Sequence, residues 1–217
     1  MKDTPINDIL ISNLSVSFEN RQIIKDFCLE LKHGEKVTLM GRSGSGKSTI
    51  LKCIMGFVES YNGEIFICGK ELNAESVWQI RTHLAYVAQE ADLGIGTTKE
   101  VIETPFTYKA NYSKRDNLKR IPELFDKLYL PIDLMEQPIS NLSGGEKQRI
   151  ALVCALLMDR EILLLDEASS ALDKTSRQAV VDYLKTLDNL TILSISHDPE
   201  GFNITDNIIE LKPINGV

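Results

Sequence analysis

The chain has 217 residues, of which 43% are hydrophobic, and a formal net charge of −7 at pH 7. A chain of this length can bury one good hydrophobic core, in one domain or in a domain with a subdomain. The acidic balance argues against a general nucleic-acid-binding protein, whose contact face would be basic, so we expect no nucleic-acid partner.

The first part of the chain is predicted to be mostly β-structure around one glycine-rich loop. Residues 9–31 alternate apolar and polar side chains, which indicates half-exposed antiparallel strands. A short apolar strand, KVTLM at 36–40, precedes the loop, and a helical pattern follows over 49–57. A hairpin-like segment at 63–72 and the strand LAYVAQ at 84–89 complete this part.

The sequence changes character between residues 92 and 141. This segment is charged and loosely helical in pattern, and Pro105, Pro122 and Pro131 interrupt it, so we interpret it as a helical insertion. Its basic residues are Lys109, Lys114, Arg115, Lys119 and Arg120. They form either a solvated helical face or a contact surface for a partner or for lipid headgroups.

From residue 142 onward, helices and strands alternate in the predicted pattern. Apolar strands are expected at 161–166, 191–196 and 207–212. Strands that are apolar throughout and alternate with helices are typical of a parallel sheet buried on both faces. We therefore predict an α/β protein.

The segment GRSGSGKS at 41–48 lies between a predicted strand and a predicted helix, which is the context of a phosphate-binding P-loop. Glycines let the backbone curl so that successive N–H groups and the helix N-terminus point at phosphate oxygens. In this pattern Lys47 reaches the β- and γ-phosphates and the Ser48 hydroxyl binds Mg²⁺. The predicted nucleotide contacts are Gly41, Arg42, Ser43, Gly44, Ser45, Gly46, Lys47, Ser48 and Thr49.

Adjacent carboxylates, Asp166 and Glu167, follow the apolar residues of the predicted strand at 161–166. Side chains alternate across a strand, so these carboxylates need not share a role. Asp166 is suited to bind the P-loop magnesium through a water, and Glu167 to polarise a water for attack on the γ-phosphate. The alternative is a carboxylate pair that caps the following helix.

The segment LSGGEKQR at 142–149 precedes the apolar run IALVCALLM and is predicted to begin a buried helix. Ser143 and Glu146 fit a capping box, in which each side chain satisfies a backbone amide of the other residue. The glycines between them are less usual, since each costs roughly 1 kcal/mol relative to alanine inside a helix. The pattern indicates a helix start at which no side chain should cover the backbone amides.

These motifs together resemble those of the nucleotide-binding subunit of an ABC transporter, over nearly the whole chain. In the order of that family, the chain has the P-loop, Gln89 after LAYVA, the signature LSGGEKQR, the strand ILLLDE, the loop SSALD ending at Asp173, and His197 after TILSIS. The resemblance implies an α/β P-loop NTPase fold. Its parts would be a RecA-like parallel-sheet core, an N-terminal antiparallel β subdomain and an inserted helical subdomain that carries the signature.

On this resemblance, residues 1–217 form a single ABC ATPase domain that binds ATP and Mg²⁺ and hydrolyses ATP. The core and the antiparallel β subdomain would comprise 1–91 and 155–217, and the helical subdomain 92–154. The implied catalytic residues are Glu167, His197 and Lys47, and the implied metal ligands are Ser48, Gln89 and Asp166. His197 would contact the γ-phosphate, and Gln89 would also sense a transmembrane partner.

Phe18 lies where an aromatic residue, most often tyrosine, stacks on adenine in this family. Its alternative interpretation is a core residue of an alternating strand. His33 and His83 have no motif around them and are interpreted as structural.

The resemblance also implies partners. Two copies would pack head to tail, so that each ATP contacts one P-loop and the signature of the other copy. The residues implied to bind ATP across this interface are Ser143, Gly144, Gly145 and Asp173. A separate integral membrane permease would be driven by closure and release of the dimer. The alternative is a non-transport ABC ATPase that acts in a cytoplasmic complex.

The expected location is the cytoplasm, at the inner face of the membrane through the permease. The amino terminus lacks the basic and apolar segments of a signal peptide, and no run reaches the roughly 20 apolar residues that cross a bilayer.

The cysteines, at 28, 53, 68 and 154, have no metal-site spacing and are expected to be buried and reduced. A similarity to FetA-type iron-export ATPases suggests metal export, although cargo and direction depend on the membrane subunit.

Overall fold

The computed structural model describes residues 7–19, 21–197, 202–205 and 207–212. One of its sheets is antiparallel and contains β1 (Asn7–Phe18), β2 (Arg21–Lys32), β4 (Asn62–Ile67) and β5 (Lys70–Glu71), in the order β2-β1-β4-β5. In the second half of β2, buried Phe27, Leu29 and Leu31 alternate with exposed residues. The predicted half-exposed antiparallel strands and the hairpin at 63–72 are therefore confirmed.

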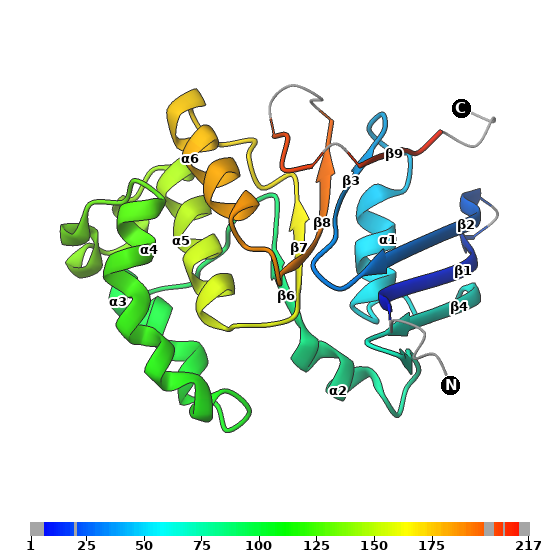
Figure 1. The fold of residues 1–217 in the computed structure, drawn as a ribbon, viewed down its shortest axis with the longest axis horizontal. Helices are drawn as coiled ribbons and strands as arrows, with labels where there is room; N and C mark the ends of the chain where they lie inside the picture. Colours follow the sequence, from blue (N-terminus) through cyan, green and yellow to red (C-terminus); the bar gives the residue numbers. More distant parts are fainter. Residues whose placement is uncertain (1–6, 20, 198–201, 206, 213–217) are drawn as a thin grey trace.

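The second sheet is parallel and lies in the middle of the molecule (Figure 1). It contains β3 (Lys36–Met40), β6 (Leu84–Val87), β7 (Ile162–Asp166), β8 (Thr191–Ser196) and β9 (Ile208–Glu210), in the order β6-β7-β8-β3-β9. Every residue of β7 and β8 is buried, which confirms the predicted parallel sheet with both faces covered. Each of its strands falls within a segment predicted to be a strand.

Side-chain alternation along β7 assigns its residues to different hydrophobic clusters. Ile162 and Leu164 pack with α1 (Lys47–Ile54) and the antiparallel sheet. Leu163 and Leu165 pack with α5 (Gly144–Leu157), α6 (Lys174–Lys185) and the helical segment. Figure 1 accordingly shows α1 between the two sheets, and α5 and α6 on the other side of the parallel sheet.

The predicted helical insertion consists of short helical pieces. These are α3 (Thr98–Glu103), η2 (Thr104–Thr107), η3 (Tyr112–Arg120), α4 (Ile121–Lys127), η4 (Ile132–Glu136) and η5 (Ile139–Asn141). Pro105 and Pro122 lie in the first turns of η2 and α4, and Pro131 directly precedes η4. Proline is tolerated there because the first N–H groups of a helix have no intrahelical acceptor. A short helix before β6, α2 (Val77–Ile80), was not predicted.

The helical pieces do not have a separate core. Phe106 and Phe125, both almost fully buried, belong to the same cluster as Leu163 of the parallel sheet. The boundaries expected at 92 and 154 stay predictions, and residues 1–6 and 213–217 of the expected domain lie outside the described residues. Within the described part of the chain, no helix is both long and apolar enough to cross a membrane.

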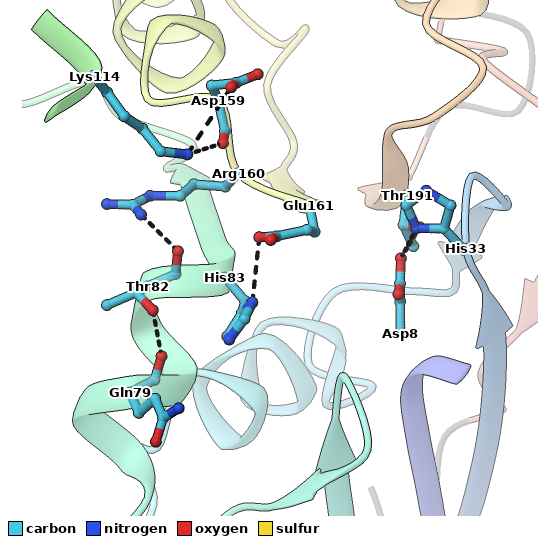
Figure 2. A network of polar contacts seen from close by, with 10 residues as sticks. All are labelled: Asp8, His33, Gln79, Thr82, His83, Lys114, Asp159, Arg160, Glu161 and Thr191. Atoms are coloured by element: carbon cyan, nitrogen blue, oxygen red, sulfur yellow. Dashed lines mark hydrogen bonds and ion pairs between the residues drawn. The ribbon is translucent and has the colours of Figure 1, made fainter. Parts of the chain in front are cut away.

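Polar contacts join the elements at the start of the parallel strands (Figure 2). His83 Nδ1 lies 3.3 Å from Glu161 Oε2, and His33 Nδ1 lies 3.0 Å from Asp8 Oδ2. Both contacts agree with the structural interpretation of these histidines. Figure 2 also shows Arg160 reaching the carbonyl oxygen of Thr82, with Nη1 and O 2.7 Å apart.

Of the basic residues of the insertion, Lys109, Arg115 and Lys119 are exposed and Lys114 and Arg120 are half-buried, which fits both a solvated face and a contact surface. Lys114 Nζ donates to the carbonyl oxygen of Asp159, and Lys119 Nζ lies 2.7 Å from Asp116 Oδ1 in an exposed pair.

The prediction of buried cysteines is confirmed for Cys53, whereas Cys68 and Cys154 are half-buried and Cys28 is exposed on β2. Its thiol is on the solvent-facing side of an alternating strand, where apolar character alone does not predict burial.

Candidate functional site

A cleft of about 610 Å³ lies where the glycine-rich loop, the ends of the parallel strands and the β1–β2 hairpin meet. It is lined by Phe18, Arg21, Ile23, Ser43, Gly44, Gly46, Lys47, Ser48, Thr49, Gln89, Glu167 and His197. All but two of these residues were predicted from separate motifs. The carboxyl ends of parallel strands meet at one edge of a sheet, which explains why the motifs converge.

The P-loop is built around a helix start that lacks a capping side chain. Gly46 is the N-cap of α1 with φ 93°, in the left-handed region that favours glycine, and no side chain accepts from the first amides. A β-carbon at Gly46 would also lie 3.1 Å from the carbonyl oxygen of Ile23. The amides at this helix start therefore remain available to an anion.

Lys47 is held within the same loop. Its Nζ donates to the carbonyl oxygens of Gly41, at 2.7 Å, and Arg42, at 3.1 Å. The side chain is buried although it carries a charge. The carbonyl contacts place the ammonium group inside the curve of the loop, where its charge faces the cleft.

Asp166, at the end of β7, has both carboxylate oxygens in hydrogen bonds. Ser48 Oγ donates to Oδ1 and the Tyr86 hydroxyl donates to Oδ2, each at 3.2 Å. Burial raises the pKa of Asp166, although both hydrogen bonds act to lower it. A hydroxyl and a carboxylate are oxygen donors of the kind that Mg²⁺ prefers, so the pair Ser48 and Asp166 fits the predicted metal. Tyr86 was not predicted.

Glu167 follows Asp166 in the chain, and its side chain is held by Gln89 and His197. Gln89 Nε2 donates to Glu167 Oε2 at 2.9 Å, and His197 Nδ1 lies 3.2 Å from the same oxygen. Glu167 has φ 47°, a left-handed conformation that is uncommon for a residue other than glycine and is concentrated at functional sites. The structure thus brings Gln89, Glu167 and His197 together around one carboxylate oxygen.

Phe18 lies at the end of the β1–β2 hairpin, where it pairs with Arg21. Its side chain is 51% exposed and borders the cleft, so the alternative interpretation as a core residue is wrong. Arg21 and Ile23 also line the cleft but were not predicted. The signal that could have identified them is the hairpin itself, which brings the start of β2 beside Phe18.

The signature residues lie at helix starts outside this cleft. Ser143 and Glu146 form the predicted capping box at α5, with the Ser143 amide donating to Glu146 Oε2 at 2.8 Å. Asp173 caps α6 by accepting from the amides of Thr175 and Ser176. None of Ser143, Gly144, Gly145 and Asp173 is among the residues that line the cleft.

Part of the glycine pattern has a local cause. A β-carbon at Gly145 would lie 2.9 Å from the carbonyl oxygen of Ala171, in the loop before α6, whereas one at Gly144 would lie 3.7 Å from Ala171 Cβ, an ordinary contact. Gly145 therefore lets the signature helix approach that loop. Gly144 is not explained by packing within the chain.

This difference between Gly145 and Gly144 predicts that alanine substitutions at the two positions change the stability of the protein differently. Gly145→Ala is expected to lower the free energy of unfolding by about 1–3 kcal/mol, because the backbone oxygen of Ala171 must move away. Gly144→Ala, the matched control, is expected to be neutral or to stabilise by up to roughly 1 kcal/mol through helix propensity. Urea unfolding of both variants measures the difference, and equal effects would contradict it.

Comparisons with known proteins agree with this geometry. Residues 24–170 match the ABC transporter family. The energy-coupling factor transporter ATP-binding protein EcfA1 of Streptococcus pneumoniae is 32% identical over 209 residues, 93% of this chain and 76% of the relative. EcfA1 of Latilactobacillus sakei is 35% identical over 196 residues, 88% of this chain and 70% of the relative.

A solved structure is similar over the whole fold. It is a dimer of the ATP-binding cassette MJ0796 in a post-hydrolysis state with ADP and Pi. The two structures superpose with a TM-score of 0.82 at 29% identity, and 94% of each chain is covered. The predicted P-loop NTPase fold is thereby confirmed. The resemblance to FetA-type ATPases is not tested by these similarities and stays a prediction.

Proposed function

Since this chain belongs to the ABC transporter family, as an ATP-binding and ATP-hydrolysing subunit, we propose that its cleft binds ATP with Mg²⁺ and that two copies close around the nucleotides. The observation that carries the proposal is the meeting of the P-loop with Gln89, Glu167 and His197 in one cleft. These residues supply a phosphate cradle, a carboxylate and polar groups in the arrangement that phosphoryl transfer needs.

Within one copy, the predicted residues in and beside the cleft have roles that their positions support. Phe18 stacks on adenine from the hairpin, and the P-loop amides with Lys47 bind the phosphates. Ser48 and Asp166 hold the metal, and Gln89 joins them from the end of β6. When bound, Mg²⁺ neutralises charge on the transferring phosphoryl group.

Hydrolysis is assigned to the carboxylate that Gln89 and His197 surround. Glu167 accepts a proton from the attacking water, and its contact with Gln89 fixes the side chain in place. His197 Nδ1, 3.2 Å from Glu167 Oε2, orients the same carboxylate oxygen, and the His197 ring also contacts the γ-phosphate. Lys47 completes the catalytic group by stabilising the charge of the phosphates.

The signature completes the site from the neighbouring copy. Ser143, Gly144 and Gly145 open α5, a helix of 14 residues whose N-terminus favours a negative ligand. They lie outside the cleft of their own chain, and the similar MJ0796 cassette forms a dimer with nucleotide. We place Ser143, Gly144, Gly145 and Asp173 on the ATP of the second copy. Gly144, which has no packing role, keeps the approach to the γ-phosphate open.

The membrane permease is proposed to bind in a groove beside Gln89. This groove of about 450 Å³ begins two residues after Gln89 and is lined by residues of the segments 91–97 and 138–140, with Glu100 and Lys147. Ile95 is fully exposed at its rim, where an apolar partner side chain could cover it. The position of this groove would link the permease directly to Gln89, the residue that holds Glu167. We infer that the chain lies at the inner face of the membrane through this permease. Cargo and direction follow from the permease.

Cysteine crosslinking tests the groove after the membrane subunit has been identified by affinity purification. Ile95→Cys in a Cys28→Ser background is expected to crosslink to that subunit. The matched control keeps Ile95 and uses the native Cys28, which is exposed on β2 and lies outside the groove. Crosslinks that form through Cys28 and not through the cysteine at 95 would contradict the proposed interface.

A further inference from the structure

The register of the parallel sheet places Tyr86 beside the end of β7. Tyr86 of β6 lies opposite Leu164, and Leu164 packs in the cluster that contains α1. Since alternate residues of a strand share a face, Asp166 projects on the same face as Leu164. The Tyr86 side chain therefore lies on the same face of the sheet as Asp166. Tyr86 is 39% exposed.

The two hydrogen bonds on Asp166 divide its oxygens. Ser48 uses Oδ1 and Tyr86 uses Oδ2, each at 3.2 Å. Rotation of a carboxylate about its last side-chain bond is otherwise soft, so contacts on both oxygens are needed to fix its plane. Asp166 is buried. If the tyrosine hydroxyl were removed, Oδ2 would lose its hydrogen bond from Tyr86, and the plane of the carboxylate would be held only through Oδ1.

The tyrosine hydroxyl is a dependable donor. The ordinary pKa of a tyrosine hydroxyl is about 10, well above neutral pH. At neutral pH the hydroxyl stays protonated and can donate to a carboxylate.

We propose that Tyr86 is a positioning residue for the metal-binding carboxylate, holding Asp166 so that Oδ1 faces Ser48. The inference rests on the proposed function, which assigns magnesium to these two residues. Groups that hydrogen-bond to a metal ligand orient it, and their removal typically weakens metal binding about 10–100-fold. Tyr86 also lies three residues before Gln89, so β6 and the residues directly after it carry the partner of Asp166 and the partner of Glu167.

The test compares Tyr86→Phe, which removes the hydroxyl and keeps the ring, with Tyr112→Phe, which removes the hydroxyl of an exposed tyrosine in η3. Both changes are made with Glu167→Gln so that bound ATP stays intact. Mn²⁺, an oxygen-preferring ion like Mg²⁺, is titrated into the ATP-bound variants after unbound ATP has been removed by gel filtration, because free ATP would itself bind the ion. Free Mn²⁺ is measured by electron paramagnetic resonance. The Mn²⁺ dissociation constant is expected to rise about 10-fold in Tyr86→Phe and to stay unchanged in Tyr112→Phe.

Two further variants separate the possible failures. Asp166→Asn reports on the metal site itself. If it weakens Mn²⁺ binding and Tyr86→Phe does not, the positioning role is wrong and the magnesium assignment stands. If Asp166→Asn has no effect, the assignment of magnesium to Asp166 is wrong, and the role of Tyr86 falls with it. Weaker Mn²⁺ binding in Tyr86→Leu but not in Tyr86→Phe would attribute the effect to ring packing and overturn the inference.

Discussion

Replacing Glu167 with glutamine is expected to slow ATP hydrolysis by about 10²–10⁴-fold, the usual contribution of a general base. Affinity for ATP should remain, because the phosphates are bound by the P-loop and not by Glu167. The amide oxygen of glutamine can still accept from Gln89, so the local geometry is retained while the proton acceptor is lost. ATP-bound dimers should accumulate, which size-exclusion chromatography with ATP would detect.

Glu161→Gln is the matched control for this prediction. Glu161 directly precedes β7, at the opposite end of this strand from Glu167, and its carboxylate contacts His83 (Figure 2). The same chemical change there should leave hydrolysis nearly unchanged. Wild-type turnover in Glu167→Gln with ATP binding intact would show that another group activates the water.

Much of the fold could be predicted from the sequence, because many helices and strands are indicated by the pattern of their own residues. Apolar runs such as ILLL predict β7 because a short apolar run bounded by polar residues is typical of a strand buried on both faces. Ser143 and Glu146 predict the start of α5 because capping is a contact between near neighbours in the chain. The prolines of the insertion predict interruptions of a helical segment, and the structure places Pro105 and Pro122 in the first turns of η2 and α4.

The parts that could not be predicted depend on contacts between distant segments. Tyr86 looks like any strand aromatic until the register of β6 against β7 brings its hydroxyl to Asp166. Gly145 looks equivalent to Gly144 until the Ala171 carbonyl is placed against it. Arg21 joins the cleft through hairpin pairing with Phe18. Motif spacing reports which residues do chemistry, but not which neighbours hold them.

The signature makes the second large prediction, because its residues lie outside the cleft that their own chain forms. One chain carries Lys47→Ala and another carries Ser143→Arg, and purification through two different tags isolates the mixed dimer. Each homodimer should be nearly inactive, since both of its sites contain one lesion. In the mixed dimer both lesions meet in one site if Ser143 serves the neighbouring copy, and hydrolysis should partly return at the other site.

The matched control carries the same two lesions in a different distribution. A chain with both Lys47→Ala and Ser143→Arg is paired with a wild-type chain. If Ser143 acts across the interface, each site of this dimer has one lesion and hydrolysis stays low. If Ser143 acts on the ATP of its own chain, this dimer keeps one intact site, and the dimer of single variants has none. Loss of the α5 cap costs roughly 1 kcal/mol in every Ser143→Arg chain, so it affects both mixed dimers equally and cannot produce opposite activities. Activity in the wild-type pairing, with none in the pairing of single variants, would therefore assign the signature to its own chain and refute the head-to-tail site.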